Sequence, residues 1–288
     1  MEEFLHWLQG TMTRPTWFGW FHILWICIMI AECVVIYIFR KKISRKTLNI
    51  ILLSTGLALI IFEIYKQVIY SFNYNSGEGN STWSYQWYAF PFQFCSTPMY
   101  LMVIAGILRK GKVYDCIKSY LATFALFAGL CVMLYPGDVF TSQIGINIQT
   151  MFWHSSMFTI GFLLLATRSI EFNFKAIIKA AYVFLVMLAI ALVMNIIWHY
   201  YGTDATFNMF YISPYYLCTL PILNIIYDSV PYVIFLILYI IGFVLAASAI
   251  LGIAILFDKI EKAIHKRKLS AEDVVVEKIL EIAKDDLK

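Results

Sequence analysis

Seven long apolar runs, separated by short polar segments, constrain the fold of this 288-residue chain more than any other feature. They lie at about 17–42, 48–70, 91–108, 117–136, 149–167, 175–199 and 231–257. Most approach the roughly 20 residues that a helix needs to cross a bilayer core, although the third run is short. Only 14% of the residues are charged, against about 25% in soluble domains. The sequence therefore predicts an all-α, polytopic membrane protein with seven transmembrane helices.

Basic residues occur in every second loop, which predicts an orientation. Residues 40–46 hold five basic and no acidic residues, and further basic clusters follow the third, fifth and seventh runs. By the positive-inside rule, the amino terminus lies outside and the carboxyl terminus in the cytoplasm. The chain then divides into a transmembrane domain (1–257) and a cytoplasmic tail (258–288). The net charge of +4 resides in these loops and does not indicate a nucleic-acid partner.

Two segments outside the runs have recognisable patterns. Ser270, followed by Glu272 and Asp273, is typical of a helix start. Residues 271–288 continue with an apolar stripe, which predicts a short amphipathic helix that docks on the core or on a helical protein partner. Residues 200–231 are rich in Tyr, Pro and Leu, and we interpret them as an interfacial segment and a candidate lid.

Polar residues inside the apolar runs converge on one predicted layer. A charge at the centre of a membrane helix costs about 2.5–3.5 kcal/mol, so such residues should be paired, in contact with water or functional. In the predicted topology four runs place polar or reactive residues in the outer third of the bilayer: Glu63, Lys66, Gln67, Gln93, Cys95, His154, Asn195 and His199. Glu63 and Lys66 are three residues apart and can pair on one helix face. This sorting to one side predicts a site there.

A thiol and an imidazole at matched depth suggest acyl chemistry on a lipid. A thiol buried among apolar groups stays protonated and unreactive, so a reactive Cys95 needs a base. His154 could take its proton and later return it to a leaving alcohol. Exposed N–H groups at the helix start near Cys95 would favour a thiolate or an oxyanion. Rival nucleophiles or oxyanion donors are Ser96, Thr97, Ser155 and Ser156. The six cysteines show no zinc-binding spacing, and neither a metal nor a soluble cofactor is implied.

Three segments resemble a known family. Phe90-Pro91-Phe92-Gln93-Phe94-Cys95-Ser96 is similar to the Pro-x-His-x-Cys-Ser element of the YwaF-like bacterial integral membrane proteins. Met151-Phe152-Trp153-His154 resembles the histidine segment of their fifth helix. Phe207-Asn208-Met209-Phe210-Tyr211, followed by Pro214, Asp228, Pro231 and Tyr232, resembles an outer stretch of the family. A eukaryotic transmembrane acyltransferase that builds polyunsaturated ether phospholipids belongs to the same group.

This resemblance implies a catalytic pair of Cys95 and His154, which lie 59 positions apart in the sequence. It implies an acyltransferase or acyl hydrolase acting on outer-leaflet phospholipids or glycolipids of a bacterial plasma membrane. Expected substrate-binding or orienting residues are Glu63, Lys66, Gln67, Gln93, Asn195, His199 and Asn208. Gln93 departs from the family, since many members carry histidine there. More distant relatives that hydrolyse fatty-acid esters use threonine, which keeps Thr97 as an alternative nucleophile.

A non-enzymatic interpretation uses the same layer as a recognition pocket. The protein would then bind or transport a lipid or another small molecule, and the Glu63–Lys66 pair would recognise a polar headgroup. The two hypotheses differ at one residue. Replacement of Cys95 by Ala abolishes an acyl transfer but leaves binding unchanged.

Overall fold

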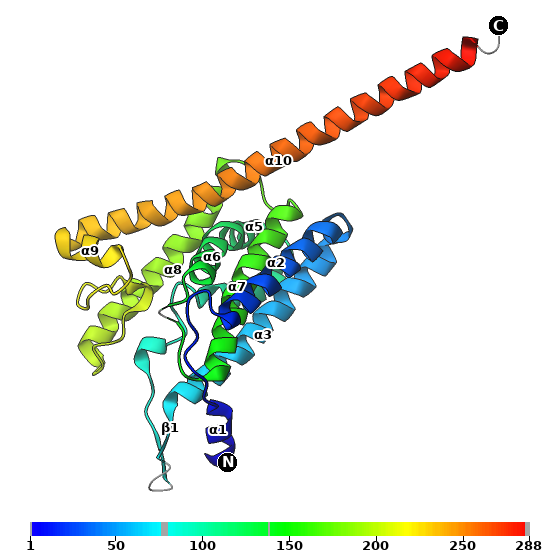
Figure 1. Cartoon of the computed structure of the whole chain (residues 1–288). Coiled ribbons are helices and arrows are strands. Elements are labelled where there is room, and N and C mark those ends of the chain that lie inside the picture. The colour runs from blue at the N-terminus through cyan, green and yellow to red at the C-terminus, as the bar shows by residue number, and fades with distance from the viewer. Residues whose placement is uncertain (1, 76–79, 138, 286–288) are drawn as a thin grey trace.

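The computed structural model describes residues 2–75, 80–137 and 139–285, with the backbone alone at residue 75 and over residues 268–285. Within that part of the chain, six helices are long and apolar enough to cross a membrane. They are α2 (Trp20–Phe39), α3 (Arg45–Ser71), the continuous segment of α5 (Lys112–Tyr120), η3 (Leu121–Ala125) and α6 (Leu126–Leu134), α7 (Ile144–Ala166), α8 (Phe174–Tyr201) and α10 (Tyr232–Asp285). The predicted all-α, polytopic class is therefore confirmed (Figure 1).

The third predicted span is shorter than expected. Of residues 91–108, only the 12 residues of α4 (Thr97–Leu108) are helical. At about 1.5 Å per residue, α4 is about 18 Å long, against a hydrocarbon core of roughly 30 Å. Residues 91–96 are irregular, and Pro98 lies in the first turn of α4, where its missing N–H is tolerated. α4 does not cross the core by itself, so seven crossings and their orientation remain predictions.

Two glycines hold α4 against α3. A Cβ on Gly56 would lie 2.9 Å from the Val103 nitrogen, and one on Gly106 would lie 2.8 Å from the Leu53 nitrogen. Small residues allow such close approach of membrane helices. Because Gly56 meets Val103 while Leu53 meets Gly106, the pair is antiparallel. This register places the start of α4 level with Glu63 on α3, and the end of α4 level with the first turns of α3.

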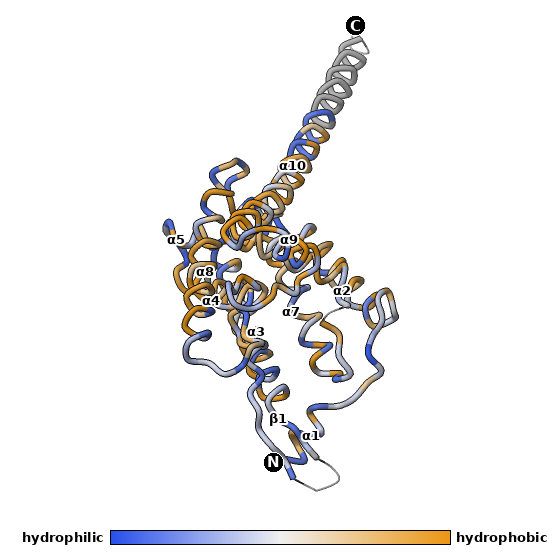
Figure 2. Tube along the Cα trace, turned by 90° about the vertical axis from the view of Figure 1, so that its left-hand side faces the viewer, coloured by the Kyte–Doolittle hydropathy of each residue, from blue (hydrophilic) through white to orange (hydrophobic). Residues whose placement is uncertain are grey.

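One end of the bundle carries a hairpin and the amino-terminal helix. The strands β1 (Phe72–Asn75) and β2 (Asn80–Trp83) pair antiparallel beside α1 (Glu2–Gln9). The Gln9 amide donates to the Phe72 carbonyl at 2.6 Å, and the Trp17 indole donates to the Leu134 carbonyl at 2.8 Å. These bonds join the amino terminus to the hairpin and to the end of α6. Figure 2 shows hydrophilic residues in blue at this end and apolar residues in orange along the helices.

The opposite end is basic and is joined by ion pairs to α10. Arg40 in η1 (Arg40–Lys42) pairs with Glu261, and Arg168 pairs with Asp258. Both acids lie on α10, beyond its apolar part. α10 is one uninterrupted helix, so residues 271–285 are helical but continue the last apolar helix, and the division into two domains stays a prediction. The helix continues because residues 258–270 contain no glycine or proline, and a serine such as Ser270 is tolerated inside a helix.

The segment between α8 and α10 packs into the bundle. It contains η4 (Met209–Tyr211) and the short helix α9 (Leu223–Ser229). Met209, Phe210, Ile212 and Ser213 are fully buried, with 0% of their surface exposed. The central part of the predicted lid is thus part of the core and does not form a surface cover.

Candidate functional site

His154 is a buried histidine with one ring nitrogen unused. It lies on α7 with 4% of its surface exposed, and its Nδ1 is 2.7 Å from the Thr150 carbonyl oxygen. A carbonyl only accepts hydrogen bonds, so Nδ1 carries the proton and Nε2 of the neutral ring presents a lone pair. Nε2 has no hydrogen-bond partner among the described residues. An unpaired buried polar group costs about 1–3 kcal/mol, so folding alone does not explain this atom.

The position of His154 is fixed by close contact between α6 and α7. A Cβ on Gly129 of α6 would lie 2.7 Å from the His154 carbonyl oxygen and 2.9 Å from the Phe158 nitrogen. Only glycine permits this approach. The backbone that carries the imidazole therefore lies directly against α6 and has little freedom to move.

Cys95 belongs to the irregular segment before α4 and is partly exposed. Its carbonyl oxygen accepts a hydrogen bond of 2.7 Å from the Trp153 indole, so this segment is tied to the residue next to His154. The two reactive side chains form no hydrogen bond with each other, because His154 Nε2 has no hydrogen-bond partner in the described part of the chain. The structure thus links the Cys95 segment to α7 through the Trp153 side chain, without a hydrogen bond between the thiol and the imidazole.

The helix start near Cys95 offers fewer free N–H groups than expected. The nitrogens of Ser96 and Thr97 both donate to the Gln93 carbonyl, at 2.8 and 3.1 Å, and the Met99 nitrogen donates to the Ser96 carbonyl at 3.3 Å. Pro98 has no N–H. The first turn of α4 therefore satisfies its own donors, and the expected oxyanion site at this helix start is not preformed.

Glu63, Lys66 and Gln67 form a mostly buried polar cluster on α3. Lys66 Nζ lies 2.9 Å from Glu63 Oε1, so the pairing predicted from their spacing is present. Gln67 donates to the same oxygen at 2.6 Å and to the carbonyl of Ala89, in η2 (Trp87–Ala89), at 2.7 Å. The other carboxylate oxygen, Glu63 Oε2, has no hydrogen-bond partner among the described groups.

This cluster is close to both reactive side chains. The charges of the Lys66–Glu63 pair both act on the Cys95 thiol, and that of Lys66 also acts on the His154 ring. The Phe62 and Phe152 rings, with centroids 4.9 Å apart, join the same turn of α3 to α7. The structure therefore brings together Glu63, Lys66, Gln67, Cys95 and the α7 segment with His154.

Three of the predicted orienting residues instead support the buried segment after α8. Asn195 donates to the Met209 carbonyl at 2.9 Å and accepts from the Met209 nitrogen at 2.7 Å. Gln93 donates to the Asn208 carbonyl at 3.0 Å and accepts from the Phe210 nitrogen at 2.9 Å. Asn208 accepts from the Ser213 nitrogen at 2.9 Å, and its amide donates to the Leu217 carbonyl at 3.1 Å. Each amide is thus occupied by backbone groups, as buried irregular backbone requires.

His199 lies away from this cluster. Its ring stacks on Tyr215 with centroids 3.6 Å apart and an angle of 7° between the planes. Its other ring contacts among the described residues are Tyr200 and Tyr216. His199 therefore packs in the aromatic connection after α8, and the structure does not bring it to His154.

Two neighbours of the cluster were not predicted. Trp153 ties Cys95 to α7, and its position beside His154 in the sequence was an available signal. Tyr120 lies before the π-helical turn η3, and its hydroxyl is 3.3 Å from the buried Thr97 hydroxyl. π turns often occur at functional sites, but nothing in this sequence marks one. Among the described residues, no group of three or more His, Cys, Asp or Glu side chains could hold a metal ion.

Comparison with known proteins adds an independent finding, since a family model described as the TMEM164 family matches residues 17–255. The chain belongs to the TMEM164 family. The match begins just before α2 and ends inside α10, so it contains every residue of the predicted site. No curated protein and no solved structure matches the chain. This TMEM164 family member is an integral membrane protein, as the apolar helices also indicate.

Proposed function

We propose that this TMEM164 family member transfers acyl chains within the membrane, with Cys95 as nucleophile and His154 as base. The observation that carries the proposal is the free Nε2 of His154. It is a buried lone pair on a neutral ring, next to the segment that holds a cysteine and close to a lysine ammonium. The resemblance to YwaF-like proteins and to an ether-phospholipid acyltransferase supports the same assignment by analogy.

The reaction has two balanced half-steps. His154 Nε2 takes the proton of the Cys95 thiol, and the sulfur attacks the carbonyl carbon of a lipid ester. The C–O bond breaks, and the imidazolium returns the proton to the leaving alcohol, which leaves a thioester on Cys95. An acceptor hydroxyl, from a lysolipid or water, then gives its proton to Nε2 and attacks the thioester. The C–S bond breaks, and the proton passes back to the sulfur.

Lys66 supplies the positive charge that this reaction needs. A fixed cation in a site of low dielectric constant stabilises both a thiolate and a developing oxyanion. The first turn of α4 has already used its N–H groups, so Lys66 takes the role that the sequence assigned to that helix start. Glu63 and Gln67 hold the ammonium in place. Entry of the ester brings the thiol and Nε2 within reach, because catalytic hydrogen bonds often tighten only when substrate binds.

The test is intact-protein mass spectrometry after incubation of the purified protein with phospholipid vesicles. We expect a fatty-acyl mass increment on the wild type that neutral hydroxylamine removes. Cys95→Ala and His154→Asn should lack it. Cys131→Ala, which removes an exposed cysteine on α6, is the matched control and should keep it. An adduct that persists in Cys95→Ala would contradict the proposal. An increment that resists hydroxylamine and disappears in Thr97→Val would assign the nucleophile to Thr97 instead.

Lipid binding or transport without chemistry is the second candidate function. The observation that favours it is the unpaired Glu63 Oε2, a buried acceptor that could receive a hydrogen bond from a lipid headgroup. In that case no variant carries an adduct. Glu63→Gln and Lys66→Ala then reduce binding of labelled lipid, while Cys95→Ala binds like the wild type.

A further inference from the structure

A second polar site lies at the other end of the α3–α4 pair. A cavity of about 540 Å³ opens between the first turns of α3 and the end of α4. Its polar lining consists of Arg45, Lys46, Asn49, Arg109 and Lys110. Asn49 and Glu63 are 14 residues apart on α3, so this cavity is about 21 Å along the helix from the Cys95–His154 cluster. The two sites are therefore separate.

None of the four cations of this cavity has a counter-charge among the residues that the structure describes. None of their side chains forms an ion pair or a hydrogen bond with another described residue, whereas four other cations at the same end are paired. The pairs are Arg40 with Glu261, Arg168 with Asp258, Lys179 with Glu171, and Lys118 with Asp115. An uncompensated group of cations around a cavity attracts an anion.

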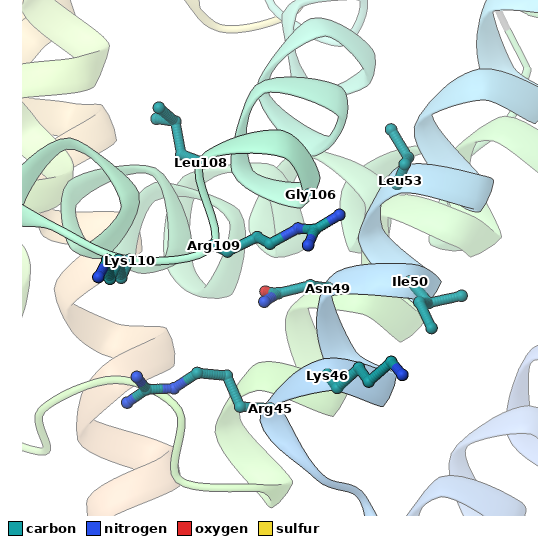
Figure 3. A pocket seen from close by; sticks show the side chains of 9 residues that line it. All are labelled: Arg45, Lys46, Asn49, Ile50, Leu53, Gly106, Leu108, Arg109 and Lys110. Atoms are coloured by element: carbon teal, nitrogen blue, oxygen red, sulfur yellow. The ribbon is translucent and has the colours of Figure 1, made fainter.

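Asn49 gives the cavity a fixed neutral donor. Only 6% of its surface is exposed, and its side-chain oxygen accepts a hydrogen bond of 2.6 Å from the Tyr114 hydroxyl. That bond occupies the acceptor and leaves the amide nitrogen as a donor. Figure 3 shows the Asn49 carboxamide and the Arg109 guanidinium in the space between the two helices. Arg109 ends α4 with a left-handed φ of 61°, a conformation usually taken by glycine.

The remaining lining is apolar and faces outward. Ile50, Leu53, Gly106 and Leu108 complete the cavity wall, and the Ile50 and Leu108 side chains are exposed on the bundle surface. The cavity thus offers cations and an amide at the end of the helices, with apolar surface alongside. A soluble anion would use only the first of these features. A phospholipid would use both, with its phosphate on the cations and its chains on the apolar surface.

We propose that this cavity binds the phosphoryl headgroup of an anionic membrane phospholipid. Arg109 and Arg45 pair with the phosphate oxygens, because guanidinium groups match phosphate geometry. The Asn49 amide donates a further hydrogen bond. The chemistry recognised is a phosphate ester, and its source is the lipid leaflet at the basic end of the bundle. This assignment does not depend on the proposed acyl transfer.

The test is native mass spectrometry of the full chain in detergent, titrated with phosphatidylglycerol. We expect Arg109→Gln to weaken binding about ten-fold or more, because it removes a charge-assisted hydrogen bond to the phosphate. Arg40→Gln is the matched control, because it removes a cation from the same end that is already paired with Glu261. It should bind like the wild type. Melting temperatures of both variants show that they fold.

Three results would overturn the assignment. Equal weakening by Arg109→Gln and Arg40→Gln would indicate general attraction to a basic surface. Unchanged binding in Arg109→Gln would show that the lipid binds elsewhere. Inorganic phosphate that binds as tightly as phosphatidylglycerol, and displaces it, would identify a soluble phosphate as the ligand.

Discussion

Two groups of polar side chains, each of which includes one residue of the irregular segment before α4, differ in their hydrogen bonding. In the amide network of Gln93, Asn195 and Asn208, each side chain is bonded to the backbone of residues 208–217. In the cluster around His154 and Glu63, two buried polar atoms have no partner among the described residues. Hydrogen bonding is thus complete in one group and incomplete in the other.

The comparison shows how a structural polar group differs from a reactive one. An irregular segment buried in a bundle leaves N–H and C=O groups that side chains must satisfy, and the amide network does this. Such residues are expected to contribute to stability. An atom that stays unpaired inside a protein makes folding less favourable, so its presence indicates another role.

The largest expected effect separates activity from stability. His154→Asn keeps a donor for the Thr150 carbonyl but removes the atom equivalent to Nε2. Because a general base contributes about 10²–10⁴-fold, we expect the acyl increment to fall by at least about 100-fold while the melting temperature stays unchanged. A melting temperature far below that of the wild type would show instead that His154 stabilises the fold, as the amide network does.

The reverse behaviour is expected of the amide network. Asn195→Leu leaves the Met209 N–H and C=O buried without partners, so we expect it to lower the free energy of unfolding by about 2–4 kcal/mol. Denaturation in mild detergent measures this change. Protein that remains folded should keep its acyl increment. Wild-type stability in this variant would mean that the segment is held by its apolar contacts alone.

Gly129→Ala tests whether the reactive group depends on helix packing. The added methyl would press on the His154 carbonyl and the Phe158 nitrogen and should cost about 1–3 kcal/mol. Because it displaces the backbone of His154, the acyl increment should fall more than the loss of folded protein explains. Gly242→Ala on α10 is the control, since a Cβ there meets nothing within 4 Å.

The smallest effect is expected at Gln93, which the family resemblance assigned to the site. A histidine cannot both accept from the Phe210 nitrogen and donate to the Asn208 carbonyl with the geometry of an amide. Gln93→His should therefore cost about 1 kcal/mol of stability and leave the acyl increment in place. A higher yield of adduct in this variant would instead show that residue 93 takes part in the acyl transfer.

The sequence predicted the membrane class and the pairing of Glu63 with Lys66 because both depend on local spacing. It also predicted a shared layer for Cys95 and His154, which the Trp153 bond to Cys95 supports. The bonding of Asn195 and Gln93 could not be predicted, since it depends on a segment more than a hundred residues from Gln93. Nor could the length of α4, because apolar composition continues through residues 91–96 while the backbone there is irregular.

The π-helical turn η3 has a consequence for how the two reactive segments are aligned. Tyr120, before the turn, meets Thr97 at the start of α4, two residues after Cys95, and Gly129, after the turn, meets His154. A π turn accommodates one extra residue, and each residue of an α-helix corresponds to about 100° of rotation. If the same residues formed a regular α-helix, the extra residue would turn one contact surface away from the other by about that angle. η3 therefore sets the angular phase between the cysteine segment and the histidine helix.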